Sequence, residues 1–501
     1  MKIVFIYPNF YRAVKYKKKD NVRATPLPPL GPLALGSYLH AKGYDVKIID
    51  MRLDCNDLDV VLEEVKDASL VGFSVMTLQV KDALKISEAI KQKYDVPIVW
   101  GDSHPSLFPK QIGEPVDFAV YREGEETILE LIEALKHKTP FKDIKGLVYR
   151  NNGDIVMNPP RDYLDMDKLP AYNYDLIPMD YYVHGQVQYT FKEVRKVAIE
   201  TSRGCPHRCA FCINVLQGRN WRMKSAERVL NEIKNLVSKY GVNHITIIDP
   251  NFFVNKERVK KICEGLIDLK ISWDADCRAD YFKQGFLDDD LLPLIKKSGC
   301  HRLIIGVESG SPIVLDMIKK DVSVENLLNC AKQCNKYGII PLMSFMIGIP
   351  NETKKDIIMT LDLKKRMKKI CPRMESGFAV FMPYPGGELY DFIVKEGLFK
   401  EPGTIREWAK EENLKLMDSE NVNVPWNKKN EKYILNVHYY ANLAYIMTRN
   451  QFFRMLRKNF IIAFGLLFFV LLARIRWQLN FYYIAFDRYL YYKAKKILRI
   501  L

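Results

Sequence analysis

Short apolar runs alternate with amphipathic segments through the first 145 residues. The runs lie at 2–7, 45–49, 70–75, 96–100 and 118–121. The segments at 33–39, 58–65, 80–93 and 125–135 carry apolar residues at helical spacing. Strands that alternate with helices predict an α/β fold with a parallel, doubly wound, Rossmann-like sheet over residues 1–145.

Sheets of this class bind ligands beyond the carboxyl ends of their strands. The residues that follow the predicted strands include Tyr7, Ser74, Thr77, Gly101, Asp102, His104, Glu123 and Gly124. Small residues let a backbone approach a large flat ligand, and hydroxyl groups can meet its polar rim. No GxGxxG follows the first strand, which argues against a dinucleotide, and a domain without any ligand is the alternative.

Residues 146–190 predict a hairpin followed by a linker. Asn152 and Gly153 separate two short apolar runs, which is a strong hairpin signal, and four prolines follow. A second series of strands begins after this connector.

The second series predicts a partial (β/α)6 barrel over residues 191–390. Its apolar runs lie at 197–201, 244–248, 272–277, 302–307, 341–347 and 377–382. Polar residues gather after these runs, at the strand ends where barrels keep their active sites. Residues 391–501 then form a helical C-terminal region that is rich in basic and aromatic residues.

Three cysteines after the first barrel strand carry the strongest chemical signal. Cys205, Cys209 and Cys212 have the spacing CxxxCxxC, with Phe211 directly before the last cysteine. Three thiolates on one tight loop can face three irons of a cubane cluster and leave the fourth iron open. Zinc would require a fourth Cys or His at a matching spacing, and three buried structural thiols are the other alternative.

This loop resembles that of the radical S-adenosylmethionine superfamily. The resemblance implies that the three cysteines are catalytic and hold a 4Fe–4S cluster, whose open iron takes the amine and carboxylate of S-adenosylmethionine. It also implies further contacts to that cofactor. The residues concerned are Phe211, Asp249, Arg278, Glu308, Ser309 and Gly348.

Each of these contacts has a plainer alternative, a solvated loop residue. Glu308 and Ser309 would meet the ribose or methionine moiety, and the backbone at Gly348 would support the adenine. Asp249 departs from the GGE motif that the family often carries there, and Arg278 is a candidate partner for the carboxylate.

The first domain resembles the cobalamin-binding domain of cobalamin-dependent radical enzymes. The resemblance lies in the third strand, GDSHPSLFP at 101–109 and REGEE at 122–126. Proteins that ligate cobalt through histidine carry DxHxxG after the second strand, whereas this chain has DMRLDC at 50–55. The resemblance therefore implies cobalamin bound without a histidine ligand, and the alternative is a domain that has lost the cofactor.

Together these resemblances imply an enzyme that methylates an unactivated carbon. The reduced cluster would cleave S-adenosylmethionine to a 5′-deoxyadenosyl radical, with electrons from a flavodoxin- or ferredoxin-type donor. The substrate radical would then take a methyl group from methylcobalamin. Alternatives are a ring-forming reaction on a lipid or tetrapyrrole, tRNA methylthiolation, and a non-catalytic cobalamin sensor or scaffold. The first domain lacks a second cysteine triad, which argues against methylthiolation.

Charge changes the picture at the C-terminus. The 501 residues carry a net charge of +16, of which +9 lies in residues 451–501, where ten Lys and Arg accompany Asp487 as the one acid. The apolar run at 460–473 has 14 residues, fewer than the ~20 that a spanning helix needs. Basic residues beside aromatic residues favour a helix on a membrane surface. The alternatives are a helix packed on the barrel and a true span.

This tail predicts a lipid-like substrate and peripheral contact with the inner face of the membrane. Nucleic acid is not expected, because the aromatic residues accompany an apolar run rather than isolated stacking positions. The N-terminus shows no secretory signal, and ten cysteines are too sparse for a disulfide scaffold, so a reducing cytoplasm is expected. Cys330 and Cys334 are predicted to be buried structural thiols rather than ligands of a second cluster.

Overall fold

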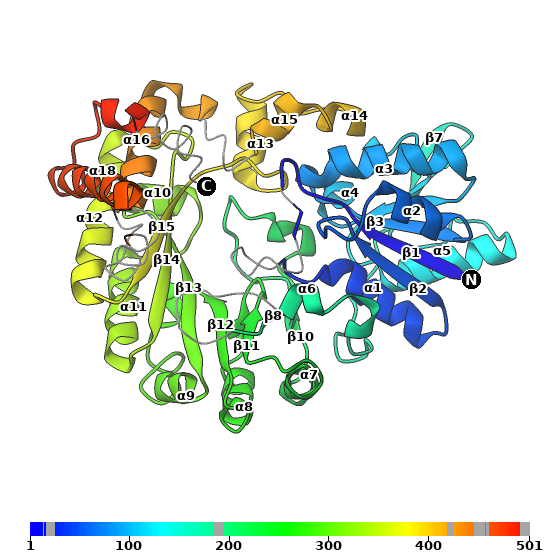
Figure 1. The fold of residues 1–501 in the computed structure, drawn as a ribbon, viewed down its shortest axis with the longest axis horizontal. Coiled ribbons are helices and arrows are strands. Elements are labelled where there is room, and N and C mark those ends of the chain that lie inside the picture. The colour runs from blue at the N-terminus through cyan, green and yellow to red at the C-terminus, as the bar shows by residue number, and fades with distance from the viewer. Residues whose placement is uncertain are drawn as a thin grey trace.

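The computed structural model describes residues 1–13, 15–16, 26–183, 194–417, 424–444, 456 and 460–490. These residues form two α/β units and a helical C-terminal part that contacts both units (Figure 1).

The first unit is a seven-stranded sheet in the order β2-β1-β3-β4-β5-β6-β7. Its parallel strands are β1 (Lys2–Tyr7), β2 (Asp45–Asp50), β3 (Leu70–Ser74), β4 (Ile98–Gly101) and β5 (Phe118–Val120). The helices between them are α1 (Leu30–Ala41), α2 (Leu58–Val65), α3 (Val80–Lys93), α4 (Ser103–Leu107) and α5 (Glu125–His137). All five residues of β3 are buried, as expected for a central strand covered on both faces. The predicted Rossmann-like fold is confirmed.

The predicted hairpin belongs to this sheet rather than to a linker. β6 (Leu147–Asn151) pairs antiparallel with β5, and β7 (Asp154–Met157) pairs with β6. The hairpin covers the edge of β5, whose backbone groups would otherwise lack partners. The sequence between the strands identified the turn, but the position of the hairpin depends on a strand about 30 residues away.

The second unit is a sheet of six parallel strands that does not close. In spatial order they are β8 (Lys196–Ile199), β11 (His244–Ile247), β12 (Ser272–Cys277), β13 (Cys300–Glu308), β14 (Ile340–Ile347) and β15 (Glu375–Val380). The outer helices are α7 (Ala226–Tyr240), α8 (Lys256–Ile267), α9 (Leu291–Lys297), α10 (Pro312–Met317), α11 (Val324–Tyr337) and α12 (Lys354–Ile370). This is the predicted partial barrel.

An ionic network joins neighbouring barrel strands. The Asp274 carboxylate lies 3.1 Å from His244 Nε2, 3.3 Å from a guanidinium nitrogen of Arg302 and 3.8 Å from Lys196 Nζ. Burial would raise the pKa of Asp274, but the hydrogen bond with His244 and the charge of Lys196 hold it at about 2. The network therefore ties four neighbouring strands together. Cys330 and Cys334 are buried on α11, as predicted.

The chain beyond the barrel returns to the first unit. Its helices are α13 (Glu388–Lys395), α14 (Ile405–Trp408) and α15 (Glu411–Lys415). The Trp408 ring lies 5.0 Å from that of Phe108 and 5.6 Å from that of His104, both in the first unit. This segment therefore holds the two units against each other.

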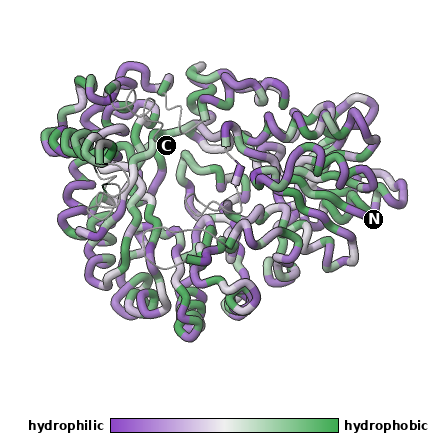
Figure 2. The backbone as a smooth tube through the Cα atoms, in the orientation of Figure 1, coloured by the Kyte–Doolittle hydropathy of each residue, from purple (hydrophilic) through white to green (hydrophobic). Residues whose placement is uncertain are grey.

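Two helices of the C-terminal part cover the open edge of the barrel. They are α16 (Glu431–Leu443) and α18 (Phe460–Leu479). The side-chain amide of Asn442 donates to Phe378 O and accepts from Phe378 N, both at 2.9 Å, and so satisfies one residue of the edge strand β15. Figure 2 shows α18 as strongly hydrophobic along most of its length.

Candidate active site between the two units

The cysteine loop is shaped by one glycine. Gly204 follows β9 (Ser202–Arg203) with φ of +77°, and a Cβ there would lie 2.3 Å from Asn220 O. Only glycine fits this position. β9 pairs with β10 (Arg222–Met223), which closes the loop that carries Cys205, Cys209 and Cys212.

The three thiols suit a cluster, which takes one thiolate on each of three irons. All are free and partly exposed, and no three Cys, His, Asp or Glu side chains converge on a single-ion site within the described part of the chain. Burial raises the pKa of the Cys212 thiol, and the nearby Cys209 and Cys205 add to this rise. A cubane spreads its thiolates over separate irons and stabilises their charge, so the loop suits a 4Fe–4S cluster.

Two side chains donate to these sulfurs. Asn251 Nδ2 lies 3.7 Å from Cys205 Sγ, and a guanidinium nitrogen of Arg278 lies 3.4 Å from Cys209 Sγ. Donors of this kind stabilise sulfur ligands and tune a cluster's potential. Arg278 also bonds Asp280 and Lys320 O, so its orientation is set by protein groups.

Asn251 belongs to a polar chain that sequence reasoning missed. Its Nδ2 donates to Tyr281 Oη at 2.8 Å, and Tyr281 Oη lies 2.9 Å from His207 Nε2. Burial and the Arg278 charge lower the pKa of His207 to about 4, so this ring is neutral at pH 7. The signal for Asn251 was available, because it follows a barrel strand in the same turn as Asp249.

Asp249 orders the start of the cysteine loop. It is fully buried and accepts hydrogen bonds from Thr201 N at 2.6 Å and from the hydroxyls of Thr201 and Ser202 at 2.5 and 2.6 Å. Burial raises the pKa of this carboxyl, while Arg258 and these hydrogen bonds oppose the rise. These contacts hold the end of β8.

Lys320 contacts both Glu308 and Phe211 and so links these two predicted residues. Lys320 Nζ lies 2.9 Å from Glu308 Oε1 and 5.7 Å from the centroid of the Phe211 ring. Glu308 itself has φ of +62°, an uncommon conformation for a residue with a side chain. The end of β13 therefore meets the cysteine loop.

Ser309 and Gly348 face other partners. Ser309 is buried, and its Oγ lies 3.0 Å from Thr360 Oγ1 on α12. Gly348 has φ of +79°, and its carbonyl accepts a 2.6 Å hydrogen bond from Trp426 Nε1. Both residues stabilise the turns after their strands.

A cavity of about 400 Å³ lies between the two units. The first unit lines it with the strand-end residues Ser74, Gly101, Asp102, Glu123 and Gly124, all predicted from the sequence. The second unit lines it with Glu200, Arg203, Ile213, Asn214 and Gln217, the last three of which belong to the cysteine loop and follow Cys212.

Three predicted residues lie outside the cavity lining. The Tyr7 ring packs under the Arg52 guanidinium at 4.4 Å. His104 and Thr77 are buried against each other, with Nδ1 and Oγ1 3.3 Å apart. Burial lowers the pKa of His104 to about 3, so the imidazole is neutral and packs against Trp408.

Small residues allow close packing at the cavity wall. A Cβ on Gly31 would lie 3.3 Å from Ser74 Oγ, and a Cβ on Gly124 would lie 3.2 Å from Leu35 Cδ2. Ser74 Oγ in turn donates to Asp102 at 2.7 Å. Residues 50–55 do not line the cavity, because Asp50 holds Arg52 and Tyr182 in a buried set of hydrogen bonds. A cobalamin bound at this wall would therefore take no ligand from this segment.

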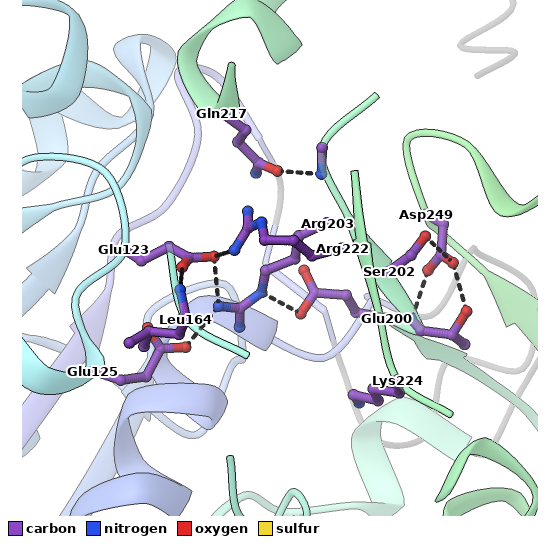
Figure 3. Close-up of polar contacts among 12 residues, drawn as sticks. Glu123, Glu125, Leu164, Glu200, Ser202, Arg203, Gln217, Arg222, Lys224 and Asp249 are labelled. Atoms are coloured by element: carbon purple, nitrogen blue, oxygen red, sulfur yellow. Dashed lines mark hydrogen bonds and ion pairs between the residues drawn. The ribbon is translucent and has the colours of Figure 1, made fainter. Parts of the chain in front are cut away.

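Ion pairs connect the cavity wall to the cysteine loop (Figure 3). Arg203, two residues before Cys205, lies 2.8 Å from Glu125, 3.2 Å from Glu123 and 2.9 Å from Glu200. Arg222 also pairs with Glu123, which accepts a hydrogen bond from Leu164 N at 2.9 Å. Burial alone would lower the pKa of Arg203, but Glu125 and Glu200 hold that pKa well above its ordinary value.

Comparisons with known proteins agree with both halves of this site. Residues 199–363 match the radical SAM superfamily, and residues 20–132 match the B12 binding domain. An uncharacterized methyltransferase, PH0819, of Pyrococcus horikoshii is 32% identical over 412 residues, 79% of this chain and 84% of the relative. An anaerobic magnesium-protoporphyrin IX monomethyl ester cyclase of Rubrivivax gelatinosus is 26% identical over 78% of this chain and 69% of that protein.

Two solved structures have the same fold. The cobalamin-dependent S-adenosylmethionine radical enzyme OxsB, with aqua-cobalamin and S-adenosylmethionine bound, has a TM-score of 0.67 at 19% identity, covering 91% of this chain and 71% of OxsB. The methyltransferase TsrM from Kitasatospora setae, with cobalamin and a [4Fe-4S] cluster bound, has a TM-score of 0.63 at 18% identity, covering 79% and 78%.

Proposed function

Because the chain belongs to the radical S-adenosylmethionine enzymes that carry an N-terminal cobalamin-binding domain, we propose that it methylates an unactivated carbon of a lipid-like substrate. It is an enzyme whose cofactors are a 4Fe–4S cluster, S-adenosylmethionine and cobalamin. When bound, these cofactors supply two things: a carbon-centred radical, which removes a hydrogen atom from the substrate, and a methyl group, which takes the place of that hydrogen.

The observation that carries this proposal is the shared cavity. One wall is made of strand ends of the first unit, and the other includes Ile213, Asn214 and Gln217, which lie in the cysteine loop after Cys212. A methyl donor and a radical source held on opposite walls can act on one substrate carbon without diffusing.

The chain's own residues position these groups. Cys205, Cys209 and Cys212 would hold the cluster, with Asn251 and Arg278 donating to two of the sulfurs. The Lys320–Glu308 pair beside Phe211 offers both a cation and a carboxylate to the polar groups of S-adenosylmethionine. Ser74, Asp102 and the glycines of the cavity wall would support cobalamin.

The substrate and its location form the finer part of the proposal. We favour a lipid-like molecule that is met at the inner face of the membrane, in the cytoplasm, with electrons from a flavodoxin- or ferredoxin-type protein. Support comes from the C-terminal region, where exposed aromatic and aliphatic side chains accompany an excess of basic residues.

An anaerobic assay tests the proposal. The reconstituted enzyme with reductant should form 5′-deoxyadenosine, and Cys205→Ala should abolish that product, whereas Cys55→Ala, at an exposed thiol outside the loop, should not. Lipids of cells with and without the gene should differ by the mass of one CH2 group. No 5′-deoxyadenosine from the intact enzyme would refute the radical chemistry. A loss of two hydrogens from the substrate would replace methylation by ring closure.

A further inference from the structure

Helix α18 combines a packed side with an exposed apolar side. Ala463, Val470, Ala473 and Trp477 are buried. The Trp477 ring lies 6.1 Å from that of Phe378 on β15 and 4.8 Å from Lys364 Nζ on α12. The helix is therefore fixed to the barrel along one side.

The opposite side carries large apolar residues at helical spacing. They are Phe460, Phe464, Phe468, Leu471, Ile475 and Leu479, with exposed fractions from 46% at Phe464 to 71% at Leu479. The successive steps of three or four residues place them in one stripe along the helix. We call these six residues the α18 stripe.

Exposed apolar residues are concentrated around this stripe. Of the 21 exposed large hydrophobic residues in the described part of the chain, 12 lie within residues 460–490. The segment after α18 is held in place, because Asn436 donates to Tyr482 O at 2.8 Å and Tyr440 donates to Asp487 at 2.7 Å. An apolar patch of this size on a soluble protein marks an interaction surface.

Charge identifies the partner. Residues 451–501 carry a net charge of +9, with Asp487 as the only acid, and Asp487 is paired with Arg476 at 2.8 Å. An apolar run that is flanked along the chain by basic residues is complementary to a bilayer that contains anionic lipids. A protein partner would leave the excess of basic residues unexplained, because charged residues are depleted at the cores of protein–protein interfaces.

The packing also decides how the helix meets the bilayer. The 20 residues of α18 are long enough to span it, and one 18-residue window, Ile462–Leu479, is apolar enough among the described residues. A spanning helix would have to detach Trp477 and its buried neighbours from the barrel. Lying flat keeps that packing and buries the exposed stripe.

We propose that the α18 stripe docks flat on the surface of an anionic bilayer and anchors the enzyme there as a peripheral protein. The docking surface adds a membrane partner to the proposed function. Its benefit for catalysis rests on the proposed lipid-like substrate. The docking itself is independent of turnover and can be measured without it.

Vesicle co-sedimentation of the full chain tests this proposal. The protein should bind vesicles of phosphatidylcholine with phosphatidylglycerol, and bind phosphatidylcholine alone or vesicles in high salt more weakly. Phe464→Gln with Phe468→Gln should reduce partitioning by at least about tenfold, since two inserted aromatic rings are lost while helix propensity is kept. Ile313→Gln is the matched control, because Ile313 is 75% exposed on α10.

Several outcomes would overturn the docking surface. They are no vesicle binding by the intact chain, equal binding by the double variant, or a dimer that this variant converts to a monomer. If the double variant melts at a lower temperature, Leu479→Gln at the exposed end of the stripe provides the second test. Vesicle binding without a methylated product would instead reject the proposed function and leave the docking surface standing.

Discussion

Replacement of Arg203 by methionine tests whether the interdomain ion pairs align the two cofactor sites. The Arg203 side chain is 10% exposed and contacts three carboxylates from both units. Methionine retains much of the volume but removes the charge and every N–H donor. The consequences differ among the three carboxylates, because each has a different set of remaining partners.

The cost of this substitution centres on Glu125. Glu123 keeps Arg222 and the amide of Leu164, and Glu200 keeps the Tyr172 hydroxyl at 2.7 Å. Glu125, 4% exposed, loses its ion pair with Arg203. Leaving one buried charge without its partner costs about 3–5 kcal/mol, a substantial part of a typical folding free energy of about 5–15 kcal/mol.

The assay combines stability with product ratio. Arg203→Met should lower the thermal midpoint of the apoprotein, and adding Glu125→Gln should recover part of the loss because the unpaired charge disappears. The ratio of 5′-deoxyadenosine to methylated product should rise, because the cysteine loop is no longer aligned with the cavity wall of the first unit and fewer radicals lead to methyl transfer. Arg208→Met is the matched control, because the Arg208–Asp321 pair is exposed and surface pairs contribute little. An unchanged midpoint together with an unchanged product ratio would refute the reasoning.

Three further predictions concern other positions. Gly204→Ala should lower the iron content of the reconstituted protein, because the new Cβ meets Asn220 O. Gly153→Ala is the control and should retain the iron, since Gly153 also has a positive φ but nothing lies within 4 Å of its Cβ. Equal iron contents in the two variants would contradict this account. Burial raises the pKa of Glu352 from 4.5 to about 8, so the folded protein binds the extra proton and stability should fall as pH rises between these values. Glu352→Gln should reduce the pH dependence of the denaturant midpoint across this range. An unchanged pH dependence would mean that other groups cause the fall in stability. Trp408→Ala should destabilise the protein by about 3–5 kcal/mol in denaturant titrations, since the ring is buried against the first unit; a loss below about 1 kcal/mol would contradict its bridging role.

The sequence carried the fold class and the central chemistry because both depend on local patterns. Alternating apolar runs predicted two sets of parallel strands, and the spacing of Cys205, Cys209 and Cys212 predicted one ligand loop. Five of the eight predicted strand-end residues of the first unit line the cavity, because parallel strands end at one edge of their sheet.

The sequence was less informative about the directions of side chains. Ser309 and His104 follow strands as predicted, but Ser309 packs on Thr360 and His104 on Trp408. The α18 helix also extends beyond the apolar run, to 20 residues, and its last turn is packed on the barrel through Trp477. Each of these outcomes depends on a neighbour that is remote in sequence or on packing along a helix side.

What the sequence determined by itself is the set of chemical groups and the elements that carry them. Only the tertiary structure decided that Arg203 meets Glu125, 78 residues earlier, and that one cavity lies between strand ends and cysteine loop. Local spacing specifies which residues share a loop or a helix side. Contacts between units depend on how two folded surfaces pack and on which buried charges find partners there, and neither is encoded in a short stretch of sequence.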